Sequence, residues 1–573
     1  MLFKMAKARK AGVFFLAAAI LAAPVGVAGC KKKRVLGNTL RVALRQKVRT
    51  IDPAHGGDYY SNVEVARAYE GLLRYNYLKR PYEIEPALAE SMPEISKDGR
   101  VYTFRIKKGV RFQNDGCFPN AIGRELAASD FVYSFNRLLD PKEASENKWL
   151  FDGKVKEVKA VDAQTLTIRL TRPNAVFLHL LTMPGASVVA REAVETYGKD
   201  FAYHPVGTGA FQLDRFSPNQ IVWIKNPSFR VERFPADVSG AGEDAGKPIP
   251  FAEKVIDDVI VEDQPAWLNF MQGNHDYLMK LPKDNVAAVW GADHKPTKEL
   301  RDRRIDLLAA PAADFTYVAF NMEDPAVGGA KNRYLRQAMS LAYDEAPTIE
   351  KFYLGLAARA EFLVPPGIPG YDPSFKNPFR AYDLTKARAI LERNGHPEGR
   401  GIPEITYETL SDSTQRQIAE YFQRSMAQLG VKIKISVATW PELLSRIRKK
   451  QPQMFGISWL YDYPDAENGY QLLYGRNESP GPNEANYKNA RYDALYEKAA
   501  PMKDGPERRK LFAKMRELAV EDVPWIFGLH RMETRLTHHW TRNYKIHAFE
   551  HNVEKYLRVD VAWRDAEGGL AGR

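Results

Sequence analysis

The amino-acid sequence predicts an α/β protein with more than one domain. Its 573 residues are too many for one hydrophobic core, and a content of 45% hydrophobic and 11% aromatic residues suits globular packing. Residues 415–429 carry apolar side chains at helical spacing, residues 431–437 alternate like a strand, and residues 441–448 return to helical spacing. A helix, a strand and a helix in such short succession are typical of α/β layers.

The other periodic segments fit the same class, and none repeats with a fixed period. Alternation and helical spacing predict, in chain order, a strand over residues 39–44, a helix over 62–73, a strand over 101–106, a helix over 129–138 and a strand over 165–170. Residues 239–250 are rich in Gly, Asp and Pro, which predicts a surface loop.

The first 29 residues have the composition of an export signal. Four basic residues within the first ten precede a run of apolar and small residues that begins at Ala11. Gly12, Pro24 and Gly26 interrupt this run, which leaves it short of the roughly 20 residues that cross a membrane. No later stretch has a continuous apolar run of spanning length.

The sequence Val27-Ala28-Gly29-Cys30 resembles a bacterial lipobox. The resemblance implies a signal peptide over residues 1–29, lipidation of Cys30 as the first mature residue, and a tether over residues 30–37. The lipid would then be the only membrane attachment. The alternatives are an ordinary signal peptide that contains a cysteine, or a short uncleaved anchor. The basic residues 31–34 either add affinity for anionic headgroups or form a solvated tether.

Charge and cysteine usage narrow the function classes. The net charge is +12, but outside residues 31–34 the Lys and Arg residues are spread along the chain, so nucleic acid is not a predicted partner. The two cysteines are Cys30 and Cys117. If Cys30 is lipidated, no intramolecular disulfide forms, and Cys117 is predicted to be a small buried thiol.

No usual catalytic or metal-binding motif is present. The sequence lacks both a His-Glu-x-x-His pair and a Gly-x-Ser-x-Gly elbow. Residues 240–248 resemble a phosphate loop only faintly, because the glycine spacing is off by one and Pro248 stands where the loop needs a hydroxyl. Adjacent side chains such as His538 and His539 point apart in regular structure. We therefore expect no enzyme, no cofactor and no metal site.

Several segments, in order and over essentially the whole mature chain, resemble the extracellular solute-binding proteins of family five. That family includes the oligopeptide- and dipeptide-binding proteins of ABC importers. The segments that carry the resemblance are Ile51-Asp52-Pro53, residues 69–73, residues 87–91, Tyr102-Thr103-Phe104, residues 109–112, residues 130–135, residues 205–211, residues 336–342, residues 382–387 and Asp522-Val523-Pro524. The chain departs from the pattern at residues 120–127, which look like an insertion and are expected on a surface loop.

The resemblance implies two α/β lobes joined by strands, a ligand between them, an extra domain on the first lobe, and hinge closure on binding. The expected parts are lobe I at residues 38–70, the extra domain at 71–204, lobe I again at 205–305, lobe II at 306–524, and the return to lobe I with the C-terminal tail at 525–573.

The resemblance also implies a ligand site in residues 455–465. In the peptide binders an aspartate three residues after a tryptophan meets the α-ammonium group of the ligand, and Asp462 after Trp459 matches that pattern. An enclosed carboxylate is costly without a compensating cation, and a peptide amine supplies one. The alternatives are that Asp462 caps a turn before Pro464, and that Trp459 is a core residue rather than a flat wall for the ligand.

Three further residues are expected at the ligand. Trp440 matches a ligand-facing position of the peptide binders, and Tyr59 is expected to face the ligand from lobe I. Tyr461 replaces the small residue that is typical before the aspartate, which would narrow the pocket. Leu460 stands where some oligopeptide binders have a disulfide cysteine, so that link is absent.

The function predicted from the sequence is that of a substrate-binding lipoprotein of an ABC importer. We expect a monomer on the periplasmic or extracellular face, tethered through Cys30, that captures peptides through main-chain hydrogen bonds and delivers them to the transmembrane subunits of a permease. The alternative ligands are an opine, a metal chelate or an oligosaccharide. A sensor or adhesin without a transport role, and a peptidase, are the alternatives from other classes.

Overall fold

The structure is a computed structural model that describes residues 37–236, 238–279, 281–291 and 295–567. The chain divides after Gly37, and all that follows concerns the unit that begins at Asn38. The expected signal peptide and the lipidation site Cys30 lie outside the described residues. Within the described ranges, no helix is both long and apolar enough to cross a membrane.

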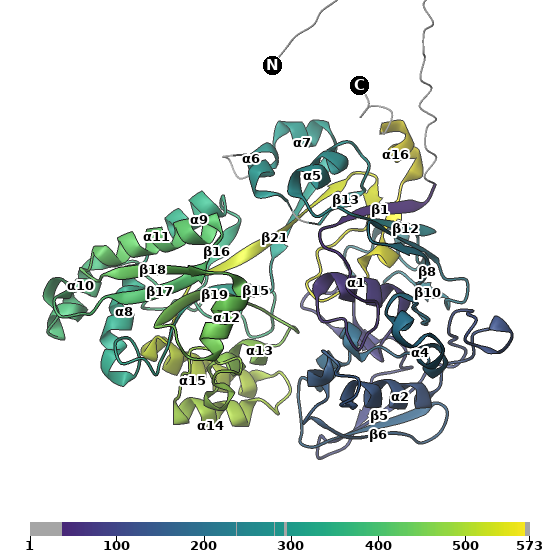
Figure 1. Ribbon diagram of the computed structural model, residues 1–573, viewed down its shortest axis with the longest axis horizontal. Coiled ribbons are helices and arrows are strands. Elements are labelled where there is room, and N and C mark those ends of the chain that lie inside the picture. Colours follow the sequence, from purple (N-terminus) through teal and green to yellow (C-terminus); the bar gives the residue numbers. More distant parts are fainter. Residues whose placement is uncertain (1–36, 237, 280, 292–294, 568–573) are drawn as a thin grey trace, which may run out of the picture. The chain divides into compact units, whose positions relative to one another are not determined.

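The largest sheet has eight strands and is mixed (Figure 1). Its order is β14 (Ile305–Pro311), β21 (Leu529–His538), β13 (Tyr277–Leu278), β1 (Thr39–Leu44), β12 (Lys254–Val259), β9 (Gln220–Lys225) and β8 (Phe211–Ser217), with β16 (Ala357–Arg359) paired to β21. β1 runs parallel to β12, whereas β21 is antiparallel to β14 and β13. Helix α1 (Tyr59–Ala68) packs against this sheet and shares its core.

A second sheet has five strands and is covered by helices on both faces. Its order is β18 (Ile433–Ala438), β17 (Ile405–Leu410), β19 (Met454–Leu460), β15 (Asp314–Phe320) and β20 (Trp525–Phe527). Alternate residues of β15 belong to two different cores, as a period of two requires: Tyr317 lies in one and Phe320 in the other. One core includes α12 (Trp440–Arg448), α14 (Ala490–Ala499) and α15 (Pro506–Asp522); the other includes α8 (Arg333–Leu341), α10 (Leu384–Arg393) and α11 (Ser413–Ala427).

A four-stranded antiparallel sheet lies within residues 71–204. Its order is β4 (Glu94–Ile95), β5 (Val101–Arg105), β7 (Thr165–Leu170) and β6 (Val155–Ala160). Helix α2 (Ala128–Leu139) packs against β6 and β7, and Phe131 and Phe135 are buried there.

Two short connections join the eight-stranded sheet to the five-stranded one. The chain leaves β14 through Ala312 and enters β15, and it returns from β20 through Gly528 into β21, the long yellow strand of Figure 1. The Ala312 N–H donates to the Arg531 carbonyl at 2.9 Å, and the Arg531 Nε–H donates to Asp314 Oδ2 at 2.8 Å. A Cβ on Gly528 would lie 2.4 Å from Thr316 Oγ1, so the second connection passes close to the start of β15.

By sheet membership, the chain changes lobe between Pro311 and Asp314 and again at Gly528, and between these points β16 returns to pair with β21. The lobe boundaries expected between residues 305 and 306 and between residues 524 and 525 stay predictions.

Most predicted elements are found close to their expected bounds. The strands over residues 39–44 and 165–170 match β1 and β7, and the helix over 129–138 lies within α2. The helix predicted over residues 62–73 is wrong in its extent. Asp58 caps α1 through the Ser61 N–H, α1 ends at Ala68, and Leu73 begins the short strand β2 (Leu73–Tyr75), which pairs with β3 (Ile84–Pro86).

Two expectations about loops are only partly met. In the expected insertion over residues 120–127, residues 120–122 are exposed, but Gly123 and Leu126 are buried. The segment over residues 239–250 is not simply a surface loop, because Asp244 and Ile249 are buried. Asp244 Oδ2 accepts hydrogen bonds from Asn543 and Arg558 at 2.9 and 2.8 Å, which ties this segment to the C-terminal part of the chain.

Cys117 is a free thiol that is half-buried rather than fully buried. Desolvation, together with the neighbouring Asp115 carboxylate, raises its pKa to about 12, so it stays protonated and unreactive at neutral pH.

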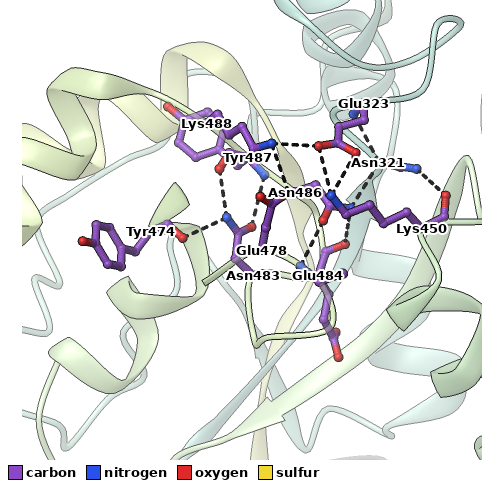
Figure 2. Close-up of polar contacts among 11 residues, drawn as sticks. Asn321, Glu323, Lys450, Tyr474, Glu478, Asn483, Glu484, Asn486, Tyr487 and Lys488 are labelled. Atoms are coloured by element: carbon purple, nitrogen blue, oxygen red, sulfur yellow. Dashed lines mark hydrogen bonds and ion pairs between the residues drawn. The ribbon is translucent and has the colours of Figure 1, made fainter. Parts of the chain in front are cut away.

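An asparagine network fixes one end of the five-stranded sheet. Figure 2 shows it between residues 474–488 and the sheet. Asn483 donates to the carbonyls of Tyr474 and Tyr487 at 3.0 and 2.8 Å, and Asn486 donates to Asn321 Oδ1 at 3.3 Å. Asn321 follows the last residue of β15, so this network lies at the opposite end of the strand from Asp314.

Candidate functional site

Asp462 lies directly beyond β19, at the end of the five-stranded sheet where the chain enters from the other sheet. Leu460 is paired with Asp314, the first residue of β15, and the Tyr461 N–H donates to the Ala313 carbonyl at 2.8 Å. The predicted site residue therefore follows a strand that is anchored to one of the two connections between the sheets.

The Asp462 carboxylate has one polar partner and no ion pair within the described part of the chain. The Asn468 side chain donates from Nδ2 to Asp462 Oδ2 at 3.1 Å. Asp462 keeps an exposed surface, but the surrounding protein removes much of its hydration. This desolvation raises the pKa of the carboxyl, and the Asn468 hydrogen bond lowers it. No backbone N–H of the described residues donates to this carboxylate, so it does not cap a turn before Pro464 as the alternative requires.

Trp459 shares its hydrogen-bond partner with Asp462. Its indole Nε1–H donates to Asn468 Oδ1 at 2.8 Å, and the same oxygen accepts the Asp462 backbone N–H at 3.3 Å. The ring is half-buried against the core that includes α14 and α15. Trp459 is therefore partly a core residue, with the rest of its surface open beside Asp462.

Tyr461 points away from this pair. Its side chain is only 6% exposed, its hydroxyl donates to the Leu363 carbonyl at 3.3 Å, and its ring lies 6.4 Å from that of Phe315. The structure thus places Tyr461 in the core of the second lobe, although it was expected to narrow the ligand pocket.

Trp440 lies at a separate cavity. It is the first residue of α12, is 49% exposed, and lines a cavity of about 130 Å³ together with Tyr353, Tyr407, Ser458 and Arg531. No hydrogen bond or ring contact joins Trp440 to Trp459 or Asp462 among the described residues.

Tyr59 belongs to the lobe built on the eight-stranded sheet. It begins α1, is 44% exposed, and its ring lies 5.7 Å from that of His551. With Arg535 and Tyr544 it borders a cavity of about 20 Å³, where desolvation raises the pKa of the Tyr59 hydroxyl. The structure therefore brings Trp459 and Asp462 together and places Trp440 and Tyr59 at two other surfaces.

Sequence reasoning missed two features of this segment. The first is Asn468, whose amide joins Trp459 to Asp462. The second is the ring of Tyr463, which stacks on that of His179 at 5.8 Å, while His179 Nδ1 lies 2.9 Å from the Tyr75 hydroxyl. These contacts join the segment after Asp462 to residues 71–204, and neither depends on a local pattern that a sequence displays.

One group of side chains within the described residues has the spacing of metal ligands. It consists of Asp52, His55 and Glu143. The Arg137 guanidinium donates to both oxygens of Asp52 at 2.7 Å each and is also bonded to Glu143. Because an arginine already neutralises these carboxylates, they form an ion-pair cluster rather than a metal site.

Comparisons with known proteins agree with this architecture. The family model "Bacterial extracellular solute-binding proteins, family 5 Middle" matches residues 83–481, more than half of the chain. The glutathione-binding protein GsiB of Escherichia coli O1:K1 is 23% identical over 492 residues, which cover 85% of this chain and 87% of that protein.

Among solved structures, the periplasmic binding protein DppA of Helicobacter pylori, in complex with the peptide STSA, has a TM-score of 0.72 at 24% identity and covers 91% of this chain and 98% of its own. HbpA2 of Haemophilus parasuis has a TM-score of 0.77 at 23% identity, and the match covers 91% of this chain and 100% of that one. These likenesses show the two-lobed fold of periplasmic binding proteins. The chain therefore belongs to the bacterial extracellular solute-binding proteins of family 5, which are the substrate-binding proteins of ABC transporters and not enzymes.

Proposed function

We propose that this protein captures peptides with a free amino terminus between its two lobes and delivers them to the transmembrane subunits of an ABC importer. In this proposal Asp462 binds the α-ammonium group, and Trp459 provides a flat wall beside it. Trp440 and Tyr59 contact the ligand from their separate surfaces.

The observation that carries the proposal is the unpaired carboxylate of Asp462. It is partly desolvated, it has one neutral donor at 3.1 Å, and no cation of the described chain pairs with it. An ionised carboxylate in such surroundings is stabilised strongly by a cation that brings its own hydrogen-bond donors. The ammonium group of a peptide has three donors and one positive charge, so it fits this site.

The names of related proteins support a peptide ligand. One relative is named for binding glutathione, and the DppA structure contains the peptide STSA. Both proteins are less than 25% identical to this chain, so the ligand is argued here from Asp462 and not from them.

The proposal extends to the membrane. Cys30 would carry the lipid, residues 30–37 would form the tether, and the mature protein would work as a monomer on the periplasmic or extracellular face. The short apolar run and the residues Val27-Ala28-Gly29 before Cys30 support this part.

The ligand class is tested by native mass spectrometry of the protein purified with whatever it retains, followed by calorimetry with di- to tetrapeptides. We expect peptide masses in the spectra, and binding of free peptides that weakens when their amino groups are acetylated. Retention of an opine, a metal chelate or an oligosaccharide, with no binding of free peptides, would overturn the peptide assignment.

A further inference from the structure

The geometry points to Asn468 as the residue that positions Asp462 and Trp459 for ligand binding. This inference rests on the proposed role of Asp462 as the group that binds the ligand amine. Asn468 is 0% exposed and lies in the short helix α13 (Glu467–Tyr470), so it acts from behind the site and does not itself touch the ligand.

The oxygen and the nitrogen of the Asn468 side-chain amide bind different partners. Oδ1 accepts the Trp459 indole N–H at 2.8 Å and the Asp462 backbone N–H at 3.3 Å, and Nδ2 donates to Asp462 Oδ2 at 3.1 Å. If the amide were flipped, its NH2 group would face the indole N–H and its oxygen would face a carboxylate. Both contacts would be repulsive, so a single orientation satisfies all three partners.

The hydrogen-bond donor behind Asp462 is uncharged, which favours binding of a cationic ligand group. A lysine or arginine behind Asp462 would hold the carboxylate in place but would also neutralise it, leaving little attraction for the ammonium group of a ligand. Asparagine fixes Oδ2 with one hydrogen bond and adds no charge. The negative charge, and the second oxygen Oδ1, therefore stay available to the ligand.

The second lobe holds Asn468 in place without help from the ligand. The Asp465 carbonyl accepts the Asn468 N–H at 3.0 Å, and Asp465 Oδ1 accepts the Glu467 N–H at 2.8 Å. Asp465 Oδ2 forms a buried ion pair at 2.6 Å with Arg508 of α15. The backbone that carries the amide is thus fixed before binding, which lowers the entropic cost of ordering the site.

The first test needs no ligand and follows the indole N–H resonance of Trp459 in protein labelled with 15N-tryptophan, assigned with Trp459→Phe. In the native protein this resonance should titrate with Asp462, and Asp462→Asn should abolish the titration. Asn468→Ala should shift the resonance and raise the pH at which it titrates, because the carboxylate loses its donor.

The second test is calorimetry from pH 4 to 8 with a peptide that has a free amino terminus. We expect Asn468→Ala to weaken binding roughly tenfold at neutral pH, as for one lost hydrogen bond to a charged group, and to move the acidic loss of binding to higher pH. In the Asp462→Asn background the same substitution should change affinity less than twofold.

An unchanged Trp459 resonance and titration in Asn468→Ala would overturn the inference whatever the ligand is. An altered resonance with an unchanged pH profile of binding would also overturn it, because Asn468 would then be structural only. Failure of the proposed amine binding would appear differently, as equal effects of Asp462→Asn on free and acetylated peptides.

Discussion

The ring of Tyr463 stacks on the ring of His179 at a centroid distance of 5.8 Å and an interplanar angle of 22°. Tyr463 follows Asp462 directly and lies in the second lobe, whereas His179 belongs to residues 71–204. A residue next to the proposed ligand contact thus also takes part in the contact between the two parts of the chain. The proposed ligand contact at Asp462 and the packing of these two parts therefore involve the same short segment.

The first prediction concerns acid sensitivity at this contact. Burial lowers the pKa of His179 from 6.5 to about 4, against a smaller raising effect of Asp465. The unfolded chain takes up a proton at this residue below pH 6.5, and the folded chain does so only near pH 4. The free energy of unfolding should therefore fall as the pH drops from 6.5 to 4, by at most about 3 kcal/mol for this residue.

His179→Phe keeps a ring against Tyr463 and removes the titration. Urea unfolding should therefore show that the free energy of unfolding falls less between pH 7 and pH 5 in this variant than in the native protein. His538 and His551 have pKa values lowered to about 4 as well, so part of the pH dependence should persist. His396→Phe is the matched control, because His396 also stacks on a tyrosine, Tyr334, but is only half-buried. An equal pH dependence in His179→Phe and the native protein would refute the prediction.

The second prediction concerns Asp462. Asp462→Asn keeps the shape of the side chain and removes its charge, which costs the charge-assisted part of the contact, about 1.5–3 kcal/mol. Affinity for a peptide with a free amino terminus should fall roughly 10- to 100-fold in calorimetry, and far less for the same peptide with an acetylated amine. Asp302→Asn, at an exposed position remote in sequence, should leave both affinities unchanged. Equal losses for the two peptides would show that Asp462 does not bind the amine.

Period-two patterns predict the bounds of several strands of this protein well. β1 and β7 match their predicted bounds, although β1 is buried on both faces. Helix α1 was misplaced because the side chain of Asp58 fixes its start and the pairing of β2 with β3 takes the residues beyond its end, and both are contacts that spacing alone does not show.

At the candidate site, too, local periodicity predicts some features, whereas others depend on tertiary contacts. Phe455, Ile457, Trp459 and Tyr461 continue one alternation, and all four lie on or against the same core. The alternation of the strand therefore predicts that Tyr461 points into the core. Only the resemblance to the family pattern placed Tyr461 at the ligand pocket. Asn468 had no such signal, because its role depends on the turn that brings it back to Trp459 and Asp462.

The third prediction concerns the anchor. Cys30→Ser should leave the precursor unprocessed or release the protein into the soluble extracytoplasmic fraction, because lipidation needs the thiol. Radiolabelled palmitate incorporation and membrane fractionation measure this directly. Cys117→Ser, which removes the other cysteine, should stay labelled and membrane-bound. Labelling that persists in Cys30→Ser would exclude this residue as the lipid site.

The fourth prediction concerns closure. The two lobes are joined by the short connections at Ala312 and Gly528, by the pairing of β16 with β21 and by side-chain contacts, so a ligand held between them should draw them together. Small-angle scattering should give a smaller radius of gyration with saturating peptide than without it. Asp462→Asn at the same peptide concentration should give an intermediate value. A scattering profile that does not change at saturation would rule out hinge closure, while leaving binding itself intact.

The last prediction concerns Glu484, a carboxyl group in the loop that the asparagine network fixes (Figure 2). Its Oε2 is buried and has no hydrogen-bond partner among the described residues, and desolvation raises its pKa from 4.5 to about 7, with a small opposing effect of Arg448. Between pH 4.5 and pH 7 the unfolded chain loses this proton and the folded chain retains it. The free energy of unfolding should therefore fall as the pH rises through this range, by at most about 3 kcal/mol.

Glu484→Gln removes the titration and keeps the shape of the side chain. Its free energy of unfolding, measured in urea, should match that of the native protein near pH 4.5 and exceed it at pH 8. Glu404→Gln, at an exposed position of the same lobe, is the control and should change stability at neither pH. If Glu484→Gln shifts stability by the same amount at both pH values, Glu484 is ionised in the folded protein, and the buried oxygen must have a partner that compensates its charge.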